Sequence, residues 1–310
     1  MKVLLTGGAG FIGSHVLQLA AKCSDLKIVV LDNLSGGRRE HVPDCQEIRL
    51  QVGDIRDKKL IDELFAAEHF DAVLHLAAQT MVPYSLQHPQ EDCDINLMGV
   101  LNILEACRKY GVRRVTFSSS AAVYGDNLNI PLQETEVPAP ASCYGLTKLA
   151  TEHYLRIYHD LYGLDTTVLR FANVYGERQG AGGEGGVISI FCKLLAQGQG
   201  VTVYGTGEQT RDYVYAGDIA EALLRTLQLS GFQIINVSTR QETSLLQLLE
   251  AFRGAAGHDF PVRFAPAREG DIFRSVLDNA ACKKYLGFCP QMPLREGLER
   301  TYADYLRRQD

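Results

Sequence analysis

The chain lacks the marks of membrane and nucleic-acid-binding proteins. It has no run of 18 apolar residues, so no transmembrane helix is expected. Lysine and arginine never occur more than two in a row and the net charge is −6, which argues against nucleic acid or an anionic membrane as the main partner. The N-terminus opens directly into a strand-like run, so we expect no secretory signal and a cytoplasmic protein.

The eight cysteines are scattered along the chain. None form a C-x-x-C pair, and the two nearest, Cys282 and Cys289, are seven residues apart. This spacing predicts neither a zinc site nor a disulfide framework, so we expect reduced thiols and no metal. With 310 residues, of which 46% are hydrophobic, the chain can bury a large core in one or two packed domains.

Short β-branched runs alternate with helical stretches over residues 1–170, which predicts an α/β fold with a mainly parallel sheet and helices on both faces. A helix at 217–229 and a strand at 233–237 should return to this sheet. We therefore predict a first domain of residues 1–170 with 213–240, and a smaller discontinuous α+β domain of 171–212 and 241–310. The predicted strands are residues 3–5, 27–31, 47–52, 72–76, 115–118 and 167–170, and the clearest helices are 97–110 and 151–162.

Glycines at 7, 10 and 13 follow the first predicted strand and open a helix over 11–21. Such a turn lets the backbone approach a pyrophosphate closely, and the helix N-terminus offers N–H groups to the phosphates. A purely structural turn is the alternative. The glycine-rich run at 176–186 is likewise either a surface loop or a mobile lid over a ligand.

Asp32 ends the second predicted strand, 19 residues after Gly13. A carboxylate there can bind the ribose hydroxyls of an adenine dinucleotide and would repel a 2′-phosphate, which favours NAD over NADP. We interpret the nearby Arg38 and Arg39 as solvated loop charges. Asp54 follows the third strand and is either part of an adenine site or the N-cap of the next helix.

Tyr144 and Lys148 stand at i and i+4, so on a helix they share one face. An ammonium group beside a phenol lowers the cost of the phenolate, so we expect Lys148 to depress the pKa of Tyr144 toward neutrality and make it a general base. Ser120 lies just past a predicted strand, where its hydroxyl could bind the reacting oxygen. Together with the glycine turn, these residues indicate a nicotinamide cofactor beside a proton-transferring tyrosine.

These motifs resemble the extended short-chain dehydrogenase/reductase family, and within it the nucleotide-sugar 4-epimerases of the UDP-glucose 4-epimerase type. The resemblance covers nearly the whole chain and implies a Rossmann-type doubly wound parallel sheet, bound NAD and a nucleotide-diphosphate sugar, most often a UDP-sugar, as substrate. The segments that carry it are 6–15, 32–34, 75–78, 118–125, 144–148, 170–176, 207–214 and 268–271.

The resemblance also implies roles for individual residues. Ser120, Tyr144 and Lys148 would be catalytic. Two guanidinium groups, of Arg211 and Arg268, suit a pyrophosphate, although either one alone could be a surface arginine paired with an acid. The expected cofactor-binding residues are Gly7, Gly10, Phe11, Ile12, Gly13, Asp32, Asn33, Asp54, Ile55, Leu76, Ala77, Ala78, Gln79, Asn96, Ser118, Tyr144 and Lys148. The expected substrate-binding residues are Ser120, Tyr144, Asn173, Val187, Tyr204, Arg211, Arg268 and Asp271.

Ala121 and Ala122 help to choose the reaction. Family dehydratases carry an Asp-Glu pair after the serine and decarboxylases a Glu, and a methyl group cannot transfer a proton. We therefore expect epimerisation at C4 of UDP-glucose/UDP-galactose or of an N-acetyl or uronic-acid counterpart. A nucleotide-sugar oxidoreductase, decarboxylase or dehydratase is the enzyme alternative, and a dinucleotide-sensing regulatory protein the non-enzyme one.

Three smaller features complete the expectations. Cys143 replaces a proline that is common in the family, which should change little. Ser275 falls where some epimerases carry a bulky residue, so a larger sugar could fit. Apolar stripes on two helices predict a homodimer through a four-helix bundle, as the family commonly forms, with burial inside the monomer as the alternative. The stripes are Leu97, Val100, Leu101 and Leu104, and Leu149, Tyr154, Leu155 and Tyr158.

Overall fold

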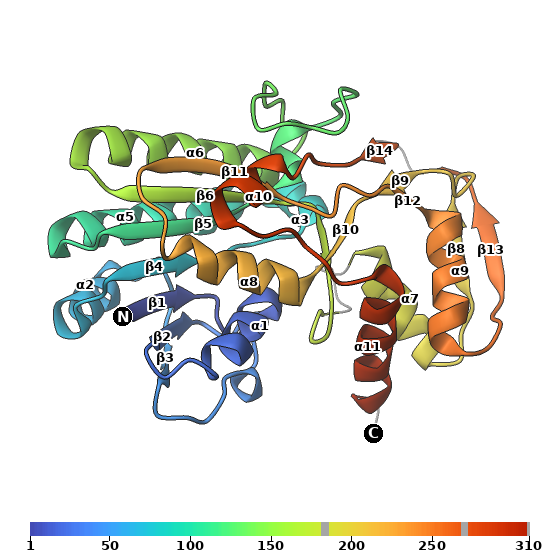
Figure 1. Cartoon of the computed structure of the whole chain (residues 1–310), viewed down its shortest axis with the longest axis horizontal. Coiled ribbons are helices and arrows are strands. Elements are labelled where there is room, and N and C mark those ends of the chain that lie inside the picture. Colours follow the sequence, from blue (N-terminus) through green and yellow to red (C-terminus); the bar gives the residue numbers. More distant parts are fainter. Residues whose placement is uncertain (181–185, 268–271, 309–310) are drawn as a thin grey trace. The chain divides into compact units, whose positions relative to one another are not determined.

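The computed structural model describes residues 1–180, 186–267 and 272–308. Their contacts divide the chain into two compact units, which are coloured along the sequence in Figure 1. Unit 1 comprises Met1–Gly125, Val137–Arg170 and Ala220–Ile235. Unit 2 comprises Asp126–Glu136, Phe171–Ile219 and Asn236–Asp310.

Unit 1 is built on a seven-stranded sheet with the order β11-β6-β5-β4-β1-β2-β3. The strands from β3 through β5 pair in parallel. Strand order reverses between β1 and β4, as in a doubly wound Rossmann sheet, and ligands bind such sheets at this switch point. The strands are β1 (Lys2–Thr6), β2 (Lys27–Asp32), β3 (Ile48–Val52), β4 (Ala72–His75), β5 (Arg114–Ser120), β6 (Asp165–Phe171) and β11 (Phe232–Val237).

Helices cover both faces of this sheet. Helices α2 (Lys58–Glu68), α5 (Gly99–Tyr110) and α6 (Cys143–Tyr162) bury their apolar sides with Val115 and Phe117 in one core. Thr116 points to the opposite face because side chains alternate along a strand, and its Oγ1 lies 2.6 Å from that of Thr226 on α8 (Ala216–Thr226). Helix α1 (Phe11–Ala20) lies on the same face as α8 (Figure 1).

Short helical segments link β4 to α5 and β5 to α6. They are α3 (Val82–Gln87), α4 (Pro89–Cys93), a π-helical turn at Asp94–Met98, and a 3-10 turn at Ala121–Tyr124. Another 3-10 turn, Arg39–His41, lies between β2 and β3. Helices α5 and α6 end at Gly111 and Gly163, both with positive φ, because only glycine adopts the left-handed C-terminal position without a steric cost. No helix formed by the described residues has the length and apolar character to cross a membrane.

The apolar stripe predicted as a subunit contact is wrong in half of its members. Val100, Leu104, Leu155 and Tyr158 belong to the buried core beneath α5 and α6. Tyr154 of the predicted stripe is exposed, as expected for a contact. The other exposed apolar side chains here were not predicted, and they are Met98 at the end of the π-helical turn and Leu146, Ile157, Leu161 and Tyr162 on α6. The sequence pattern showed an amphipathic helix but not which neighbour covered each side.

Unit 2 has its own core. Helices α7, α9 and α11 pack on strands β8 and β10, with Phe191, Phe252 and Tyr302 among the buried side chains. Its small sheets are β10-β7, β12-β9-β14 and β13-β8. The elements are β7 (Asn173–Tyr175), α7 (Val187–Ala196), β8 (Val201–Tyr204), β9 (Thr210–Arg211), β10 (Tyr213–Tyr215), β12 (Thr243–Ser244), α9 (Leu245–Ala256), β13 (Val262–Ala265), β14 (Arg274–Ser275), α10 (Ala280–Leu286) and α11 (Leu294–Arg307).

The units differ from the expected domain boundaries at three places. Residues 126–136 join unit 2, because the Leu132 amide donates to the carbonyl of Val276 and the Asp278 amide donates back to Leu132. Residues 213–219 and 236–240 also lie in unit 2, with β10 pairing in parallel with β7. The strand expected at 233–237 does lie in the large sheet, as β11 beside β6. Of the run expected as a loop or lid, residues 181–185 lie outside the described residues.

Candidate active site

The glycine turn joins β1 to α1 at the switch point of the sheet. Gly7 has φ +70°, and a Cβ there would lie 2.7 Å from the nitrogen of Ala77. A Cβ on Gly13 would lie 2.4 Å from the carbonyl oxygen of Gly7. Gly10 caps α1, whose first residues are Phe11 and Ile12. The turn therefore needs glycine for its own geometry, and it leaves a helix N-terminus facing the end of the sheet, the position that binds a pyrophosphate in this fold.

Asp32 lies at the end of β2 beside this turn. Its Oδ2 accepts a hydrogen bond of 2.9 Å from the Ala9 amide, and its Oδ1 one of 2.8 Å from the Leu34 amide. Burial raises the pKa of this carboxyl, and the two amides lower it. A carboxylate has about four acceptor positions, so Asp32 retains capacity for ribose hydroxyls. Arg38 has a side chain 61% exposed and pairs with Glu40, as expected for a solvated loop charge.

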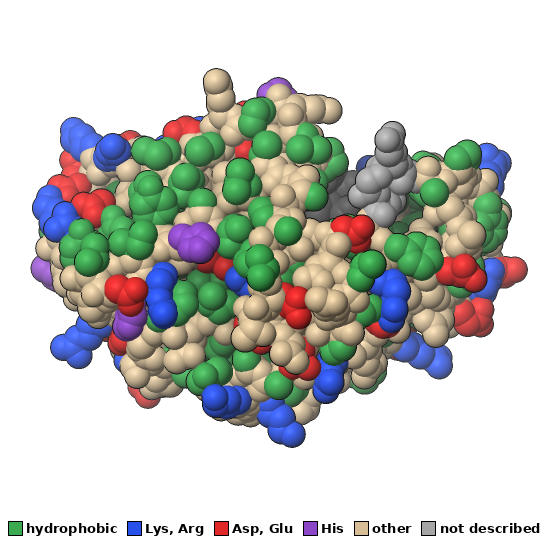
Figure 2. Space-filling model, turned by 90° about the horizontal axis from the view of Figure 1, so that it is seen from above, with side chains coloured by type: hydrophobic (Ala, Val, Ile, Leu, Met, Phe, Trp, Pro, Cys, Tyr) green, Lys and Arg blue, Asp and Glu red, His purple; other side chains and the backbone are tan. Residues whose placement is uncertain are grey.

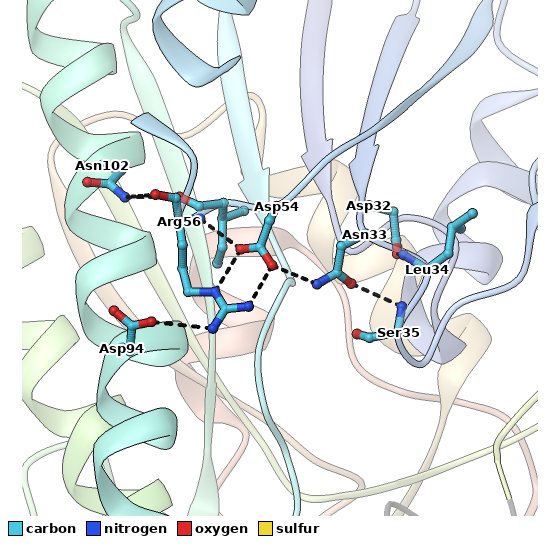
Figure 3. A network of polar contacts seen from close by, with 9 residues as sticks. Asp32, Asn33, Leu34, Ser35, Asp54, Arg56, Asp94 and Asn102 are labelled. Atoms are coloured by element: carbon cyan, nitrogen blue, oxygen red, sulfur yellow. Dashed lines mark hydrogen bonds and ion pairs between the residues drawn. The ribbon is translucent and has the colours of Figure 1, made fainter. Parts of the chain in front are cut away.

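A polar network extends from Asp32 toward α5 (Figure 3). The Asn33 amide donates to Asp54 at 2.9 Å, and Arg56 forms an ion pair of 2.8 Å with the same carboxylate. Arg56 hydrogen bonds hold the pKa of Asp54 well below its usual range. The alternative in which Asp54 caps the next helix is wrong, because Asp57 accepts from the first amides of α2. Asp54 is thus an ionised, half-buried carboxylate at the end of β3.

Hydrogen bonds to Thr6 and to Asn96 fix the segment that follows β4. The Ala77 amide donates to Thr6 Oγ1 at 3.2 Å. The Gln79 amide donates to Asn96 Oδ1 at 2.8 Å, and Asn96 Nδ2 donates back to the Gln79 carbonyl at 2.9 Å. Asn96 is buried in the π-helical turn, a type of turn that is frequent at functional sites. Leu76, Ala77, Ala78 and Gln79 are half-buried along this segment, while Ile55 is part of the core.

Helix α6 presents the expected catalytic pair. Ser142 caps it by accepting from the Gly145 amide at 3.1 Å, and the Tyr144 amide donates to Ser85 Oγ at 3.1 Å. Ser120 ends β5, where its hydroxyl accepts from the Ala122 amide at 3.2 Å. The Ser120 hydroxyl is also hydrogen-bonded to the phenol of Tyr144. The structure therefore brings Ser120 and Tyr144 together although they are 24 residues apart in the sequence.

Lys148 lies beneath Tyr144. Its Nζ donates to the Ser118 carbonyl at 2.8 Å and lies 5.7 Å from the centre of the Tyr144 ring. Burial lowers the pKa of Lys148 to about 7, against the opposing charges of Asp92 and Glu152. The expected fall in the pKa of Tyr144 is not found. Burial raises the pKa of Tyr144 to about 12, and the hydrogen bond from Ser120 offsets only part of this rise.

A buried ion pair supports the site from behind. Arg170 of β6 donates to Glu152 of α6 at 2.6 Å and 3.0 Å, and both side chains are 3% exposed. Ser119 Oγ donates to the same carboxylate at 2.5 Å, and the guanidinium lies 4.7 Å from the centre of the Tyr124 ring. This cluster holds the chain on both sides of Ser120. Double hydrogen bonding to a carboxylate fixes orientation as well as charge.

Of the expected substrate residues, Ser120 and Tyr144 lie in unit 1, and the others that the structure describes lie in unit 2. Asn173 is exposed on β7, Val187 begins α7, and Tyr204 ends β8. Arg211 ends β9 and donates to the Thr210 carbonyl at 2.8 Å. Its register partner on β14 is Ser275. Arg268 and Asp271 lie outside the described residues.

The structure adds side chains to the site that the motifs did not indicate. Asp92 is buried on α4 and accepts from Thr147, which stands between Tyr144 and Lys148 on α6. Ser85 on α3 holds the start of α6. Thr147 was the one local sign of this contact. It lies between Tyr144 and Lys148, where its side chain must face a neighbour in the interior. Nothing in the sequence indicated which residue that neighbour is.

Comparison with known proteins agrees with this geometry. Residues 3–238 match the NAD dependent epimerase/dehydratase family. The UDP-glucose 4-epimerase of Thermotoga maritima, solved with UDP-glucose, is 38% identical with a TM-score of 0.95, and the match covers 100% of both chains. The UDP-glucose 4-epimerase of Thermus thermophilus, solved with NAD, is 40% identical with a TM-score of 0.91, over 98% of this chain and 99% of that one.

A third similar structure is that of an epimerase named for a different sugar. The UDP-N-acetylglucosamine 4-epimerase of Methanobrevibacter ruminantium, in complex with UDP-N-acetylmuramic acid, is 33% identical with a TM-score of 0.93, over 99% of this chain and 98% of that one. The family match, the sheet order and the Ser120, Tyr144 and Lys148 cluster all agree. The chain therefore belongs to the NAD-dependent epimerase/dehydratase family, among the nucleotide-sugar 4-epimerases of the extended short-chain dehydrogenase/reductases.

Proposed function

We propose that this NAD-dependent nucleotide-sugar 4-epimerase interconverts UDP-glucose and UDP-galactose, with Ser120, Tyr144 and Lys148 as its catalytic residues. The observation that carries the proposal is the cluster itself. A phenol hydrogen-bonded to a serine stands over a buried lysine, at the end of β5 in a doubly wound sheet. The glycine turn and Asp32 lie in the same unit, where a dinucleotide would bind. The substrate chemistry is that of the Thermotoga relative.

The residues suit a proton transfer at the 4-hydroxyl of the sugar. When bound, NAD would supply the acceptor for the C4 hydride and, in its oxidised form, a positive charge in the site. Tyr144 accepts the hydroxyl proton as C4 is oxidised and returns it after the 4-keto sugar has turned over. Ser120 donates a hydrogen bond that stabilises the phenolate. An ammonium at Lys148 stabilises the same anion, which matters because burial holds the pKa of Tyr144 high, at about 12, despite the hydrogen bond from Ser120.

Ala121 and Ala122 support plain epimerisation. They follow Ser120 in a 3-10 turn at Ala121–Tyr124, where a carboxylate would be needed to move a proton at a second carbon. The neighbouring acid of α6, Glu152, is engaged by Arg170 and Ser119 and is buried. The dehydratase and decarboxylase alternatives therefore have less support.

We predict a product of the same mass as the substrate, inverted at C4, formed without net NADH accumulation. Hydride returns to the carbon that gave it, so substrate deuterated at C4 should keep its label. The measurement is mass spectrometry and NMR of the product from UDP-glucose or UDP-galactose. A product lighter by water or carbon dioxide, loss of the C4 label to solvent, or stoichiometric NADH release would each reject the proposed reaction.

Unit 2 is the proposed substrate-binding part, through Asn173, Tyr204, Arg211 and Val187. A specific observation favours a second substrate class. Ser275 stands in register with Arg211 on the neighbouring strand, and paired residues of a parallel sheet project from the same face. If Arg211 binds the diphosphate, a small residue beside it leaves room for a larger sugar. The Methanobrevibacter relative, a UDP-N-acetylglucosamine 4-epimerase, supports testing UDP-N-acetyl sugars beside UDP-glucose.

We also propose that the protein is a homodimer through α6. Leu146, Ile157 and Leu161 of this helix are 57%, 46% and 69% exposed and follow one another at helical spacing. Figure 2 views the molecule from the side on which α6 lies in Figure 1, and apolar side chains are prominent there. Exposed apolar side chains that gather on one helix face mark an interaction site. A cytoplasmic location stays a prediction.

The dimer proposal predicts twice the monomer mass by light scattering at micromolar concentration. A double Ile157→Glu and Leu161→Glu variant should give the monomer mass, because charges on the contact would remain desolvated in the dimer. Replacing Phe264, which is 61% exposed in unit 2, with glutamate serves as the control and should leave the mass unchanged. A monomeric wild-type protein would refute the proposal.

A further inference from the structure

Asp92 is a buried carboxylate between the segment after β4 and helix α6. Its Oδ1 accepts from Gln79 Nε2 at 3.0 Å and from Asn96 Nδ2 at 3.1 Å. Its Oδ2 accepts from Thr147 Oγ1 at 3.0 Å. The side chain has no exposed surface, and all of these donors are neutral. Asp92 thus contacts both the expected cofactor segment, at Gln79, and the catalytic helix, between Tyr144 and Lys148.

The negative charges of two buried acids, Asp92 and Glu152, act on Lys148 and raise its pKa. Glu152 is already paired, because Arg170 donates to both of its oxygens. Asp92, by contrast, forms no ion pair with any arginine or lysine among the described residues. A buried charge needs a counter-charge, so the acid that is left to balance an ammonium at Lys148 is Asp92.

The other groups around Lys148 cannot take this role. His75 of β4 is buried, burial lowers its pKa to about 3, and it is therefore neutral at physiological pH. Ser118 offers a carbonyl oxygen at 2.8 Å, and Phe117 a ring whose centre lies 4.7 Å from Nζ. Tyr144 is the group whose proton moves in the reaction. A carbonyl dipole and a ring face stabilise an ammonium less than a full negative charge does.

We propose that Asp92 is a positioning residue that keeps Lys148 an ammonium ion beside Tyr144 and ties this charge to the Gln79 segment. The inference rests on the proposed function, because it assigns Asp92 to the proton transfer at Tyr144. Thr147 links the two elements, since it donates to Asp92 and lies one residue before Lys148. The negative charge of Asp92 raises the pKa of both Lys148 and Tyr144.

The test is Asp92→Asn, which removes the charge and leaves the shape. The asparagine oxygen can still accept from Gln79 and Asn96. Its amide nitrogen can donate to Thr147 Oγ1, whose own proton then goes to the Tyr144 carbonyl at 3.0 Å. Each of the three hydrogen bonds that Asp92 makes to Gln79, Asn96 and Thr147 therefore has a counterpart in the variant. Glu91→Gln is the matched control, an exposed acid beside Asp92 on α4 that accepts from Tyr84.

Both limbs of the pH profile of kcat should move to lower pH in Asp92→Asn, by about one unit, since a charge within about 12 Å shifts a pKa by that much at an effective dielectric constant of 20. The control should keep the wild-type profile. A merely structural role would lower kcat by one factor at every pH and leave the limbs in place. That outcome would overturn the proposal, provided that circular dichroism shows a folded variant.

A second measurement does not depend on turnover. The Nζ resonance of Lys148 in protein labelled with ¹⁵N-lysine, assigned by its absence in Lys148→Met, gives the pKa of the amine directly. It should fall by about one unit in Asp92→Asn and not in Glu91→Gln. An unchanged pKa would overturn the proposal. If the wild-type protein fails to invert C4, the proposed function is rejected, and the titration still decides whether Asp92 sustains the charge of Lys148.

Discussion

Replacing Tyr144 with phenylalanine should slow turnover by about 10²–10⁴-fold, the range for loss of a general base. The phenolic oxygen is the proton acceptor in the proposed reaction, and Ser120 is the side chain hydrogen-bonded to it. The ring stays, so packing on α6 and binding of the UDP-sugar should change little. The measurement is kcat for C4 inversion, with the dissociation constant of the substrate taken separately by calorimetry.

The matched control is Tyr285→Phe, which removes the same atom from an exposed tyrosine of α10. It should have wild-type kcat. Near-normal turnover in Tyr144→Phe would place the base elsewhere. A variant that binds substrate much more weakly would show instead that Tyr144 serves binding and not proton transfer.

Glu152→Gln should destabilise the fold by about 3–5 kcal/mol, the usual cost of removing one partner of a buried ion pair. Arg170 would keep its charge in a position only 3% exposed, with no carboxylate beside it. The glutamine amide has only one acceptor oxygen, so Ser119 and Arg170 would compete for it. The measurement is urea unfolding followed by circular dichroism, because the chain has no tryptophan to serve as a fluorescent probe.

Glu221→Gln gives the comparison for an exposed pair. Glu221 and Arg225 lie 2.7 Å apart with side chains 38% and 43% exposed, and such pairs contribute about 0–1 kcal/mol. If the two variants unfold at the same urea concentration, the buried pair adds nothing beyond a surface pair. The role of Glu152 in holding Ser119 would then be wrong as well.

The glycine turn could be predicted from the sequence because its requirements are local. Gly7 needs a positive φ, and Gly13 must have no Cβ because of the Gly7 carbonyl. Both requirements arise within the turn itself. The strands were predictable for a similar reason, since runs buried on both faces are apolar throughout. Tyr144 and Lys148 were found because four-residue spacing places them on one helix face.

The surroundings of these residues could not be predicted in the same way. Asp92 meets Thr147 across 55 residues of sequence and Gln79 across 13, and no local period carries such contacts. The apolar stripe of α5 shows the same limit. Its pattern predicted an amphipathic helix, but Val100 and Leu104 turned out to face the sheet. The predicted fall in the pKa of Tyr144 was also wrong, because burial raises this pKa. Burial is a property of the whole fold and cannot be seen in a local spacing.

Strand β11 has a consequence for the order in which the protein is made. The large sheet has β6 as an outer strand until Phe232–Val237 has been synthesised. Until then, Arg114 lacks the carbonyls of Leu227 and Leu229, and Thr116 lacks Thr226. A ribosome-bound chain ending near residue 170 therefore carries an uncovered sheet edge, which is prone to pair with other chains. Residues 171–219 of unit 2 are translated during that interval, so they are synthesised before β11 completes the sheet of unit 1.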